Sequence, residues 1–71
     1  MTQREAIIDY IETFGSITPF EAFADLGITK LATRISEMRR SGMQFKIEIM
    51  KTQNRYGKTV HYAKYSFAEV R

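Results

Sequence analysis

The side chains with the clearest chemical potential lie between positions 30 and 40. They recur every three or four residues: Lys30, Thr33, Arg34, Glu37 and Arg40. In a helix this spacing gathers them on one side. Arginine and lysine pair with guanine and with phosphate oxygens, and threonine bonds to bases or contacts a thymine methyl group. The spacing therefore predicts a helix that contacts DNA. The alternative is an ordinary solvated helix face.

Two members of this group have a competing use. For Glu37, an ion pair with a neighbouring cation of the helix is favoured over a bond to cytosine, because phosphates repel a lone carboxylate. Arg34 lies at the flank of the face, where a bond to the preceding helix or to a hairpin competes with DNA. Lys30, Thr33 and Arg40 are therefore the stronger candidates.

A second basic group occupies residues 51–58, a polar, turn-rich segment. Its candidate DNA-binding residues are Lys51, Asn54, Arg55 and Lys58. A basic hairpin tip beside a recognition helix reaches phosphates or the minor groove. The alternative is a flexible loop that charge keeps soluble. Asn54 and Gly57 are the positions where we expect a positive φ.

Two threonines complete the candidate site. Thr18 precedes Pro19 and stands three residues before Glu21, which predicts a capping box at a helix start. The amides of a helix start also bind phosphate, although capping is the more frequent use of such a threonine. Thr29 is expected to cap the helix of about residues 30–41.

Composition argues against an enzyme. The chain has 71 residues, no cysteine and one histidine, so we expect no disulfide, no metal site and no nucleophile–base pair. It has no glycine-rich phosphate loop, and we expect no cofactor. No apolar run is long enough to span a membrane, and the N-terminus lacks the core of a signal peptide. A cytoplasmic protein is expected.

Charge is unevenly distributed along the chain. Residues 1–28 carry one arginine against five carboxylates, a net charge of −4, whereas residues 29–71 carry ten lysines and arginines against three glutamates, a net charge of +7. Such asymmetry indicates that one side of the molecule faces a polyanion. The alternative is a solvated basic surface of the kind common in small proteins.

Helical periodicity defines the elements that must position these residues. The first helix is predicted at residues 3–14, with a capping box at Thr2 and Glu5. A short extended link follows, and Ile17 should enter the core. The second helix is expected from Pro19 to about Asp25, and we expect three of its apolar side chains to be buried: Phe20, Phe23 and Leu26. Gly27 should end it.

The third helix has a buried stripe, after which the period changes from helical to two. The stripe is Leu31, Ile35 and Met38, which predicts a face turned to the core. A strand from about residue 43 should bury one face, formed by Phe45, Ile47 and Ile49. A second strand is expected at residues 59–67, apolar on its inner face from Ala63 onward and polar toward the tip. Residues 68–71 are expected to form a short tail.

The order of elements is that of a winged helix-turn-helix, an α+β fold with three helices and a C-terminal hairpin wing. This fold often has a brief strand at the position of Ile17. We expect residues 1–71 to form one domain. The chain resembles small winged helix-turn-helix proteins of phage and prophage genomes. Four segments carry the resemblance: Gly15–Ala22, Leu26–Gly42, Asn54–Gly57 and Tyr65–Phe67.

The resemblance implies binding of double-stranded DNA, with the helix of residues 30–41 in the major groove and the 51–58 wing on the backbone or the minor groove. The role would be a transcription regulator or an architectural, excisionase-like factor in a bacterial host cell. The alternative is a protein–protein adaptor, or an inhibitor of host machinery, that presents the acidic face of the first helix to a host protein. Monomer and homodimer are both compatible with the sequence; a dimer would use the first helix, the tail or a hairpin edge.

Overall fold

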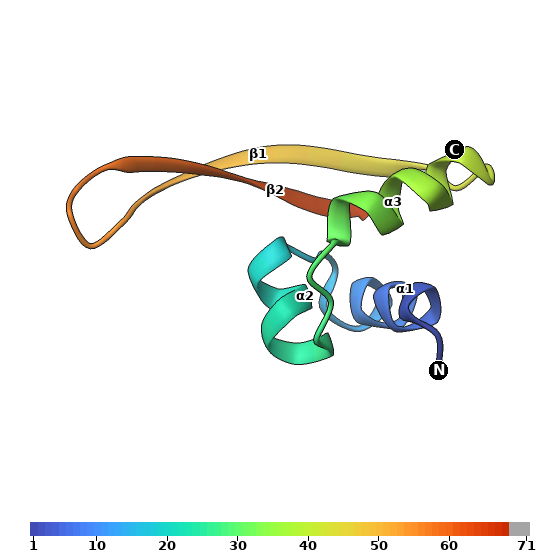
Figure 1. Ribbon diagram of the computed structural model, residues 1–71. Coiled ribbons are helices and arrows are strands. Elements are labelled where there is room, and N and C mark those ends of the chain that lie inside the picture. Colours follow the sequence, from blue (N-terminus) through green and yellow to red (C-terminus); the bar gives the residue numbers. More distant parts are fainter. Residues whose placement is uncertain (69–71) are drawn as a thin grey trace.

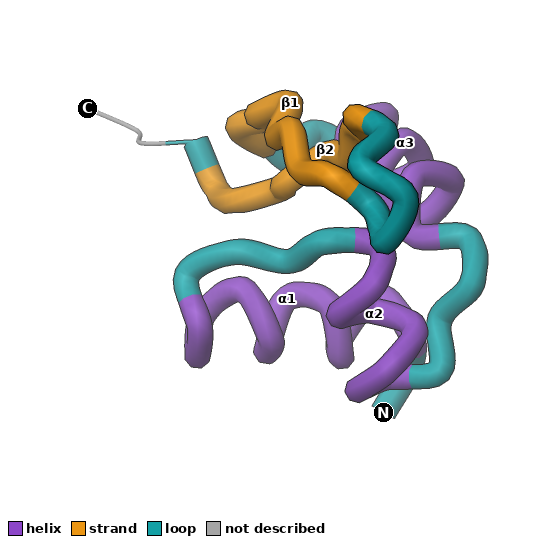
Figure 2. Tube along the Cα trace, turned by 90° about the vertical axis from the view of Figure 1, so that its left-hand side faces the viewer, coloured by secondary structure: helices purple, strands orange, loops and turns teal. Residues whose placement is uncertain are grey.

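The computed structural model describes residues 1–68, and within them it has the predicted α+β architecture. The elements, in order, are α1 (Gln3–Phe14), α2 (Pro19–Leu26), α3 (Leu31–Arg40), β1 (Phe45–Gln53) and β2 (Thr59–Phe67). Helices α1 and α2 form a lower layer, and the two strands and α3 lie above them (Figure 2). The hairpin extends well past the N-terminal end of α3 (Figure 1).

Local sequence signals fix where the first two helices start and stop. At α1, the Glu5 amide donates to Thr2 Oγ1 and the Thr2 amide donates to Glu5 Oε1, over 3.1 and 3.2 Å. At α2, Thr18 and Glu21 exchange the same pair of bonds over 3.0 and 3.2 Å. The predicted capping boxes are thus both present. Gly15 and Gly27 end the two helices in the left-handed conformation, which a glycine adopts without a Cβ penalty.

The core joins the three helices to the base of the hairpin. Its buried side chains are Ile7, Tyr10, Ile11, Ile17, Ala22, Ile28, Leu31, Ile35, Met38 and Tyr65. The stripe predicted for α3 is therefore buried as expected. Ile17 also forms the brief strand position: its amide and carbonyl both bond to those of Tyr65, over 2.8 Å each. This bridge fastens β2 to the link between α1 and α2.

The prediction for the side chains of α2 was wrong for both phenylalanines. Phe20 is 77% exposed and Phe23 is 61% exposed. The fully buried side chain of α2 is Ala22, and Leu26, one turn later, packs half-buried against the core. Because successive helical residues are rotated by about 100°, burying Ala22 and Leu26 turns Phe20 and Phe23 outward. The two aromatic rings gave a misleading signal about which face is buried.

The predicted cap of α3 was also wrong. Lys30, not Thr29, occupies the N-cap position, and no side chain bonds to the free amides there. Lysine carries only donors and cannot accept from an amide. Thr29 lies one residue outside the helix, in the bend that follows Ile28. The start of α3 therefore leaves backbone donors free, in contrast to α1 and α2.

β2 has the predicted bounds, but β1 continues into the segment predicted as a turn, and one face of the hairpin is less buried than expected. Phe45 pairs with Phe67, Ile47 with Tyr65 and Ile49 with Ala63. Directly paired residues share a face, so the predicted alternation is correct. However, only Phe45 of the three β1 side chains is half-buried, while Ile47 and Ile49 are 41% and 64% exposed. Their partners on β2 are better covered, because Tyr65 is buried and Ala63 is half-buried, so on this face the core covers β2 more fully than β1.

The end of the described chain is held at the base of the hairpin. The Ala68 amide donates to the Gln44 carbonyl over 3.2 Å. The rest of the predicted tail, residues 69–71, lies outside the described residues.

Candidate nucleic-acid interface

At α3, three of the predicted contact residues have exposed side chains that bond to no described residue. Lys30, Thr33 and Arg40 are all exposed; Thr33 and Arg40 lie opposite the buried stripe, and Lys30 is the N-cap residue of α3. None of their side chains makes a hydrogen bond or an ion pair with any residue of 1–68. They therefore need not break an internal bond to reach a base or a phosphate. The uncapped amides at the start of α3 add donors at the same end as Lys30.

Arg34 and Glu37 are engaged with each other. Arg34 Nη1 donates to Glu37 Oε1 at 2.5 Å, an i,i+3 ion pair within α3. The predicted intrahelical pair of Glu37 is thereby confirmed. The pair neutralises the Arg34 charge in part, and the Arg34 Nε atom is buried without a hydrogen-bond partner among residues 1–68. Arg34 is accordingly less available to DNA than Lys30 or Arg40.

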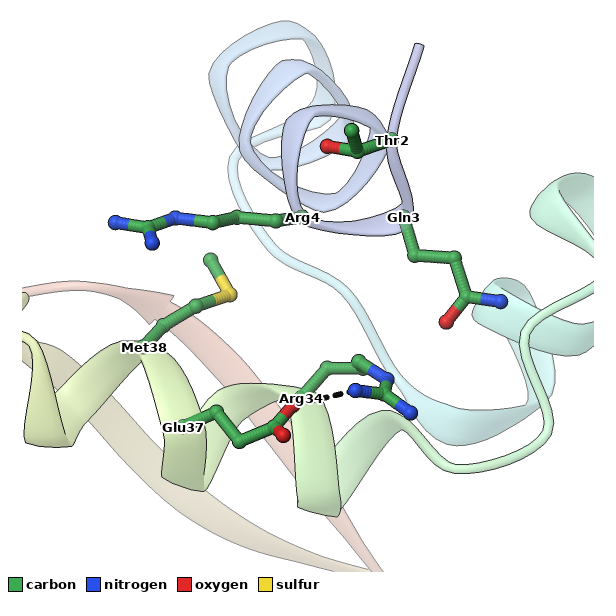
Figure 3. Close-up of a pocket in the computed structure, with 6 residues that line it drawn as sticks. All are labelled: Thr2, Gln3, Arg4, Arg34, Glu37 and Met38. Carbon is green, nitrogen blue, oxygen red and sulfur yellow. Dashed lines mark hydrogen bonds and ion pairs between the residues drawn. The ribbon is translucent and has the colours of Figure 1, made fainter.

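This ion pair lies on the wall of an open pocket between α1 and α3, with a volume of about 470 Å³ (Figure 3). Gln3 and Arg4 enter it from α1, and Arg34, Glu37 and Met38 enter it from α3. Arg4 extends along Met38 toward the end of α3, where its Nη2 donates to Ser41 Oγ over 3.3 Å. Sequence reasoning missed Arg4, because 37 positions separate the two residues and no local pattern connects them.

The tip of the wing is a hydrogen-bonded turn. Asn54 Oδ1 accepts from the amides of Tyr56 and Lys58, over 2.9 and 3.1 Å. The Asn54 amide donates to the Lys58 carbonyl, and the Gly57 amide donates to the Asn54 carbonyl. Gly57 has the predicted positive φ of 76°, but Asn54 does not, because every positive φ in residues 1–68 belongs to a glycine. Asn54 thus fixes the turn through its side chain, and Arg55 remains exposed.

Lys51 belongs to the strand and not to the tip. β1 continues to Gln53, so the turn comprises residues 54–58 rather than 51–58. Lys51 faces His61 across the ladder. The basic residues of the hairpin are thus spread along its length: Lys46, Lys51, Arg55, Lys58 and Lys64. Lys46 and Lys64 lie on one face of the hairpin and Lys51 lies on the other, so these residues do not form a single charged row.

The remaining two candidates lie at helix starts. The Thr18 hydroxyl is half-buried and accepts from the Glu21 amide, which is the capping role expected for it. Thr29 is exposed and lies next to Lys30. Thr29 therefore lies at the start of α3 with its side chain exposed. The Thr18 hydroxyl, in contrast, already accepts a hydrogen bond from the first turn of α2.

Exposed aromatic surface on α2 is a further feature that the sequence did not reveal. Phe20 lies beside an open groove of about 540 Å³ between the start of α2 and one face of the hairpin. Met50, Tyr62 and Lys64 line the hairpin side of this groove. The residues on this face alternate with those of the Tyr65 face, so the hairpin has apolar side chains on both faces.

In the acidic half of the molecule, a side-chain hydrogen bond between Tyr10 and Asp25 joins two helices. Tyr10 Oη donates to Asp25 Oδ2 over 2.6 Å, which joins α1 to α2. This hydrogen bond, with burial and the nearby Glu21 carboxylate, raises the pKa of Tyr10 to about 12.

Within residues 1–68, no group of three or more histidines and carboxylates is arranged to hold a metal ion. No helix described there is long and apolar enough to cross a membrane.

Comparison with known proteins identifies one family. A family model described as "Winged helix-turn-helix domain" matches residues 2–70. A search of curated proteins and a search of solved structures found no match. The family match spans both predicted contact segments, the helix α3 and the hairpin.

Proposed function

Because the chain belongs to the winged helix-turn-helix domain family, we propose that it binds double-stranded DNA, with α3 in the major groove and the hairpin on the backbone or in the minor groove. Domains of this family are typically DNA-binding and not enzymatic. Base contacts come from Lys30, Thr33 and Arg40, and phosphate contacts from the turn at Arg55 and Lys58. The chain acts as one domain.

The observation that carries this proposal is the availability of the cations on α3 and the wing. Lys30, Arg40 and Arg55 are exposed and have no side-chain partner within residues 1–68. An unpaired cation reaches a phosphate without giving up an internal bond, and each such contact releases a condensed counterion from DNA. Arg34, held by Glu37, supports the face from its flank and does not read a base.

We further propose that the biological role is that of a phage-type transcription regulator or an architectural, excisionase-like factor in a bacterial cytoplasm. The two roles differ in how copies are arranged on DNA. A footprint over one symmetric operator supports the regulator. Protection of tandem direct repeats near an attachment site supports the excisionase-like factor.

The test of DNA recognition is the double variant Thr33→Ala with Arg40→Ala. Sequences selected from random duplex DNA provide the probe, and affinity is measured by gel shift. We expect loss of specific binding with an unchanged circular dichroism spectrum, because both side chains are exposed. The matched control is Glu12→Gln on α1, which should bind as the wild type does. Unchanged affinity of the double variant would refute the assignment of the α3 face.

One observation favours a second candidate function, binding of a host protein partner. Phe20 and Phe23 expose their rings on one side of α2, and exposed aromatic patches mark protein interaction sites. As an adaptor or inhibitor, the chain would present this patch together with the acidic face of α1. This function predicts no duplex binding even at low salt, and it predicts that Phe20→Ser with Phe23→Ser abolishes partner binding. Duplex binding retained by that variant supports the DNA assignment.

A further inference from the structure

The outer edge of β1 is a free strand edge within residues 1–68. β2 pairs with β1 on one side and with Ile17 on the other, so β1 has a partner on one side only. Tyr65 directs its amide and carbonyl to Ile17. In an antiparallel ladder the residue opposite such a position also directs its backbone groups outward. Ile47, which faces Tyr65, therefore points its N–H and C=O to the free edge, and so do Phe45 and Ile49.

The same segment exposes apolar side chains. Ile47 and Ile49 are 41% and 64% exposed, although both lie on the hairpin face that packs on the core at Phe45 and Tyr65. An edge that combines unpaired backbone groups with exposed isoleucines is a template for another strand. Residues 45–49 read Phe-Lys-Ile-Glu-Ile. When two copies of this segment run antiparallel, apolar residues can face apolar residues and lysine can face glutamate.

We propose that β1 pairs with β1 of a second copy of this chain, antiparallel and symmetric about Ile47. In this register Ile47 faces Ile47 of the second copy, and Phe45 faces Ile49. Each of these facing pairs exchanges two backbone hydrogen bonds, because the groups of all three residues point to the free edge. Lys46 faces Glu48 of the second copy, at both ends of the symmetric contact.

Charge selects this register over its neighbours. The outward-facing backbone groups allow only shifts that keep odd-numbered residues opposite one another. Moving the symmetry axis one residue toward the start of β1 sets Lys46 against Lys46, and moving it one residue the other way sets Glu48 against Glu48. Like charges directly opposite one another destabilise a sheet, and unlike charges stabilise it. Only the axis at Ile47 pairs lysine with glutamate while it covers Ile47 and Ile49.

The monomer already holds the two charged side chains in a suitable position. Lys46 Nζ lies 3.7 Å from Glu48 Oε1 on one face of β1, and the two side chains are 64% and 45% exposed. They are therefore accessible to a second strand. The resulting sheet runs β2–β1–β1–β2, with the helices of both copies on the same side and the two wing tips at opposite ends. This contact uses none of the residues assigned to DNA, and it stands or falls independently of that assignment.

The test exchanges charges between two copies. Lys46→Glu alone sets glutamate against Glu48 at both ends of the contact, and Glu48→Lys alone sets lysine against Lys46. Each single variant should be monomeric by analytical ultracentrifugation at concentrations where the wild type is a dimer. An equimolar mixture should dimerise, because each variant then faces its opposite charge. Circular dichroism verifies that both variants fold, since Glu48 also faces Lys64 within the hairpin.

A cysteine at the symmetry axis gives an independent readout. The wild type has no cysteine, and facing residues of a hydrogen-bonded pair lie about 5.5 Å apart at Cα, within the range of a disulfide. Ile47→Cys should form a covalent dimer on mild oxidation, whereas Lys46→Cys, which faces residue 48, should form at least about tenfold less. A wild type that remains monomeric at millimolar concentration, or equal cross-linking at both positions, would overturn the proposal.

Discussion

The two halves of this small domain use their polar side chains in opposite ways. In residues 1–28 the polar groups serve the fold: Thr2 bonds with Glu5, Thr18 with Glu21, and Tyr10 with Asp25. In residues 29–68 most charged side chains have no partner within the described chain, and the ion pairs there are Arg34–Glu37 and Lys46–Glu48. The first half bonds many of its polar groups to one another, whereas the second half leaves most of its charges available to the DNA that we propose as its partner.

The same contrast between the two halves is present where α2 and α3 begin. α2 starts with a complete capping box, whereas α3 starts at Lys30 without a side-chain cap. A helix start that is left open costs stability in isolation but keeps its amides and its positive dipole end available to an anion. Under the proposed function, the open start of α3 gives up some helix stability and keeps its amides free for a DNA phosphate.

The largest expected effect comes from the buried face of α3. Ile35 is 2% exposed, and Ile35→Ala should lower the free energy of unfolding by about 2–5 kcal/mol, because it leaves a cavity. That decrease is comparable to the total stability of about 3–5 kcal/mol expected of a domain this size. Urea unfolding measures it. Ser36→Ala, on the exposed side, is the control and should change stability by less than about 0.5 kcal/mol.

A smaller effect separates the two threonines that precede helices. Thr18→Ala removes an observed cap and should cost about 1 kcal/mol. Thr29→Ala, at a residue with no capping bond, should stay within about 0.5 kcal/mol of the wild type. Thermal unfolding of the two variants side by side measures the difference. Equal destabilisation by the two substitutions would mean that Thr29 caps α3 in solution and that the two helix starts are alike.

The stability that the Tyr10–Asp25 hydrogen bond contributes should depend on pH. The folded-state pKa of Tyr10 is raised from 10.0 to about 12, so the protonated phenol stabilises the fold. This contribution is fully present below pH 10 and is lost as the pH rises toward about 12. Tyr10→Phe lacks it, so the stability difference between wild type and variant should shrink over that window. A difference that stays constant up to pH 12 would show that the Asp25 bond does not stabilise the fold.

The smallest expected effect on stability lies at the wing tip. Asn54→Ala removes the side-chain acceptor that holds the turn, but the turn lies far from the core and the global unfolding free energy should change by less than about 0.5 kcal/mol. Duplex affinity should fall by more than stability does, because Arg55 and Lys58 lose their fixed positions. Equal stability together with unchanged affinity would indicate that the turn is not a contact site.

Sequence reasoning predicted the elements well and the exposed surfaces poorly, for physical reasons. Capping boxes, glycine stops and the change of period at Met43 are local signals, and they located every described helix and strand to within a few residues. Whether Phe20 is buried depends on how α2 is rotated against the core, and whether Ile49 is buried depends on how far the helices reach beneath the hairpin. Arg4 meets Ser41 only through tertiary packing. None of these is encoded within a short window.

The salt dependence of duplex DNA binding tests the central claim most directly. Four neutralising substitutions on the basic side, Lys30→Gln, Arg40→Gln, Arg55→Gln and Lys58→Gln, are compared with Asp9→Asn and Glu12→Gln on the acidic side. The plot of log affinity against log salt should become shallower by about 1 for each phosphate that the basic-side variant no longer neutralises. The acidic-side variant should keep the wild-type slope. Equal slopes for all three proteins, or no duplex binding by the wild type at low salt, would contradict the account.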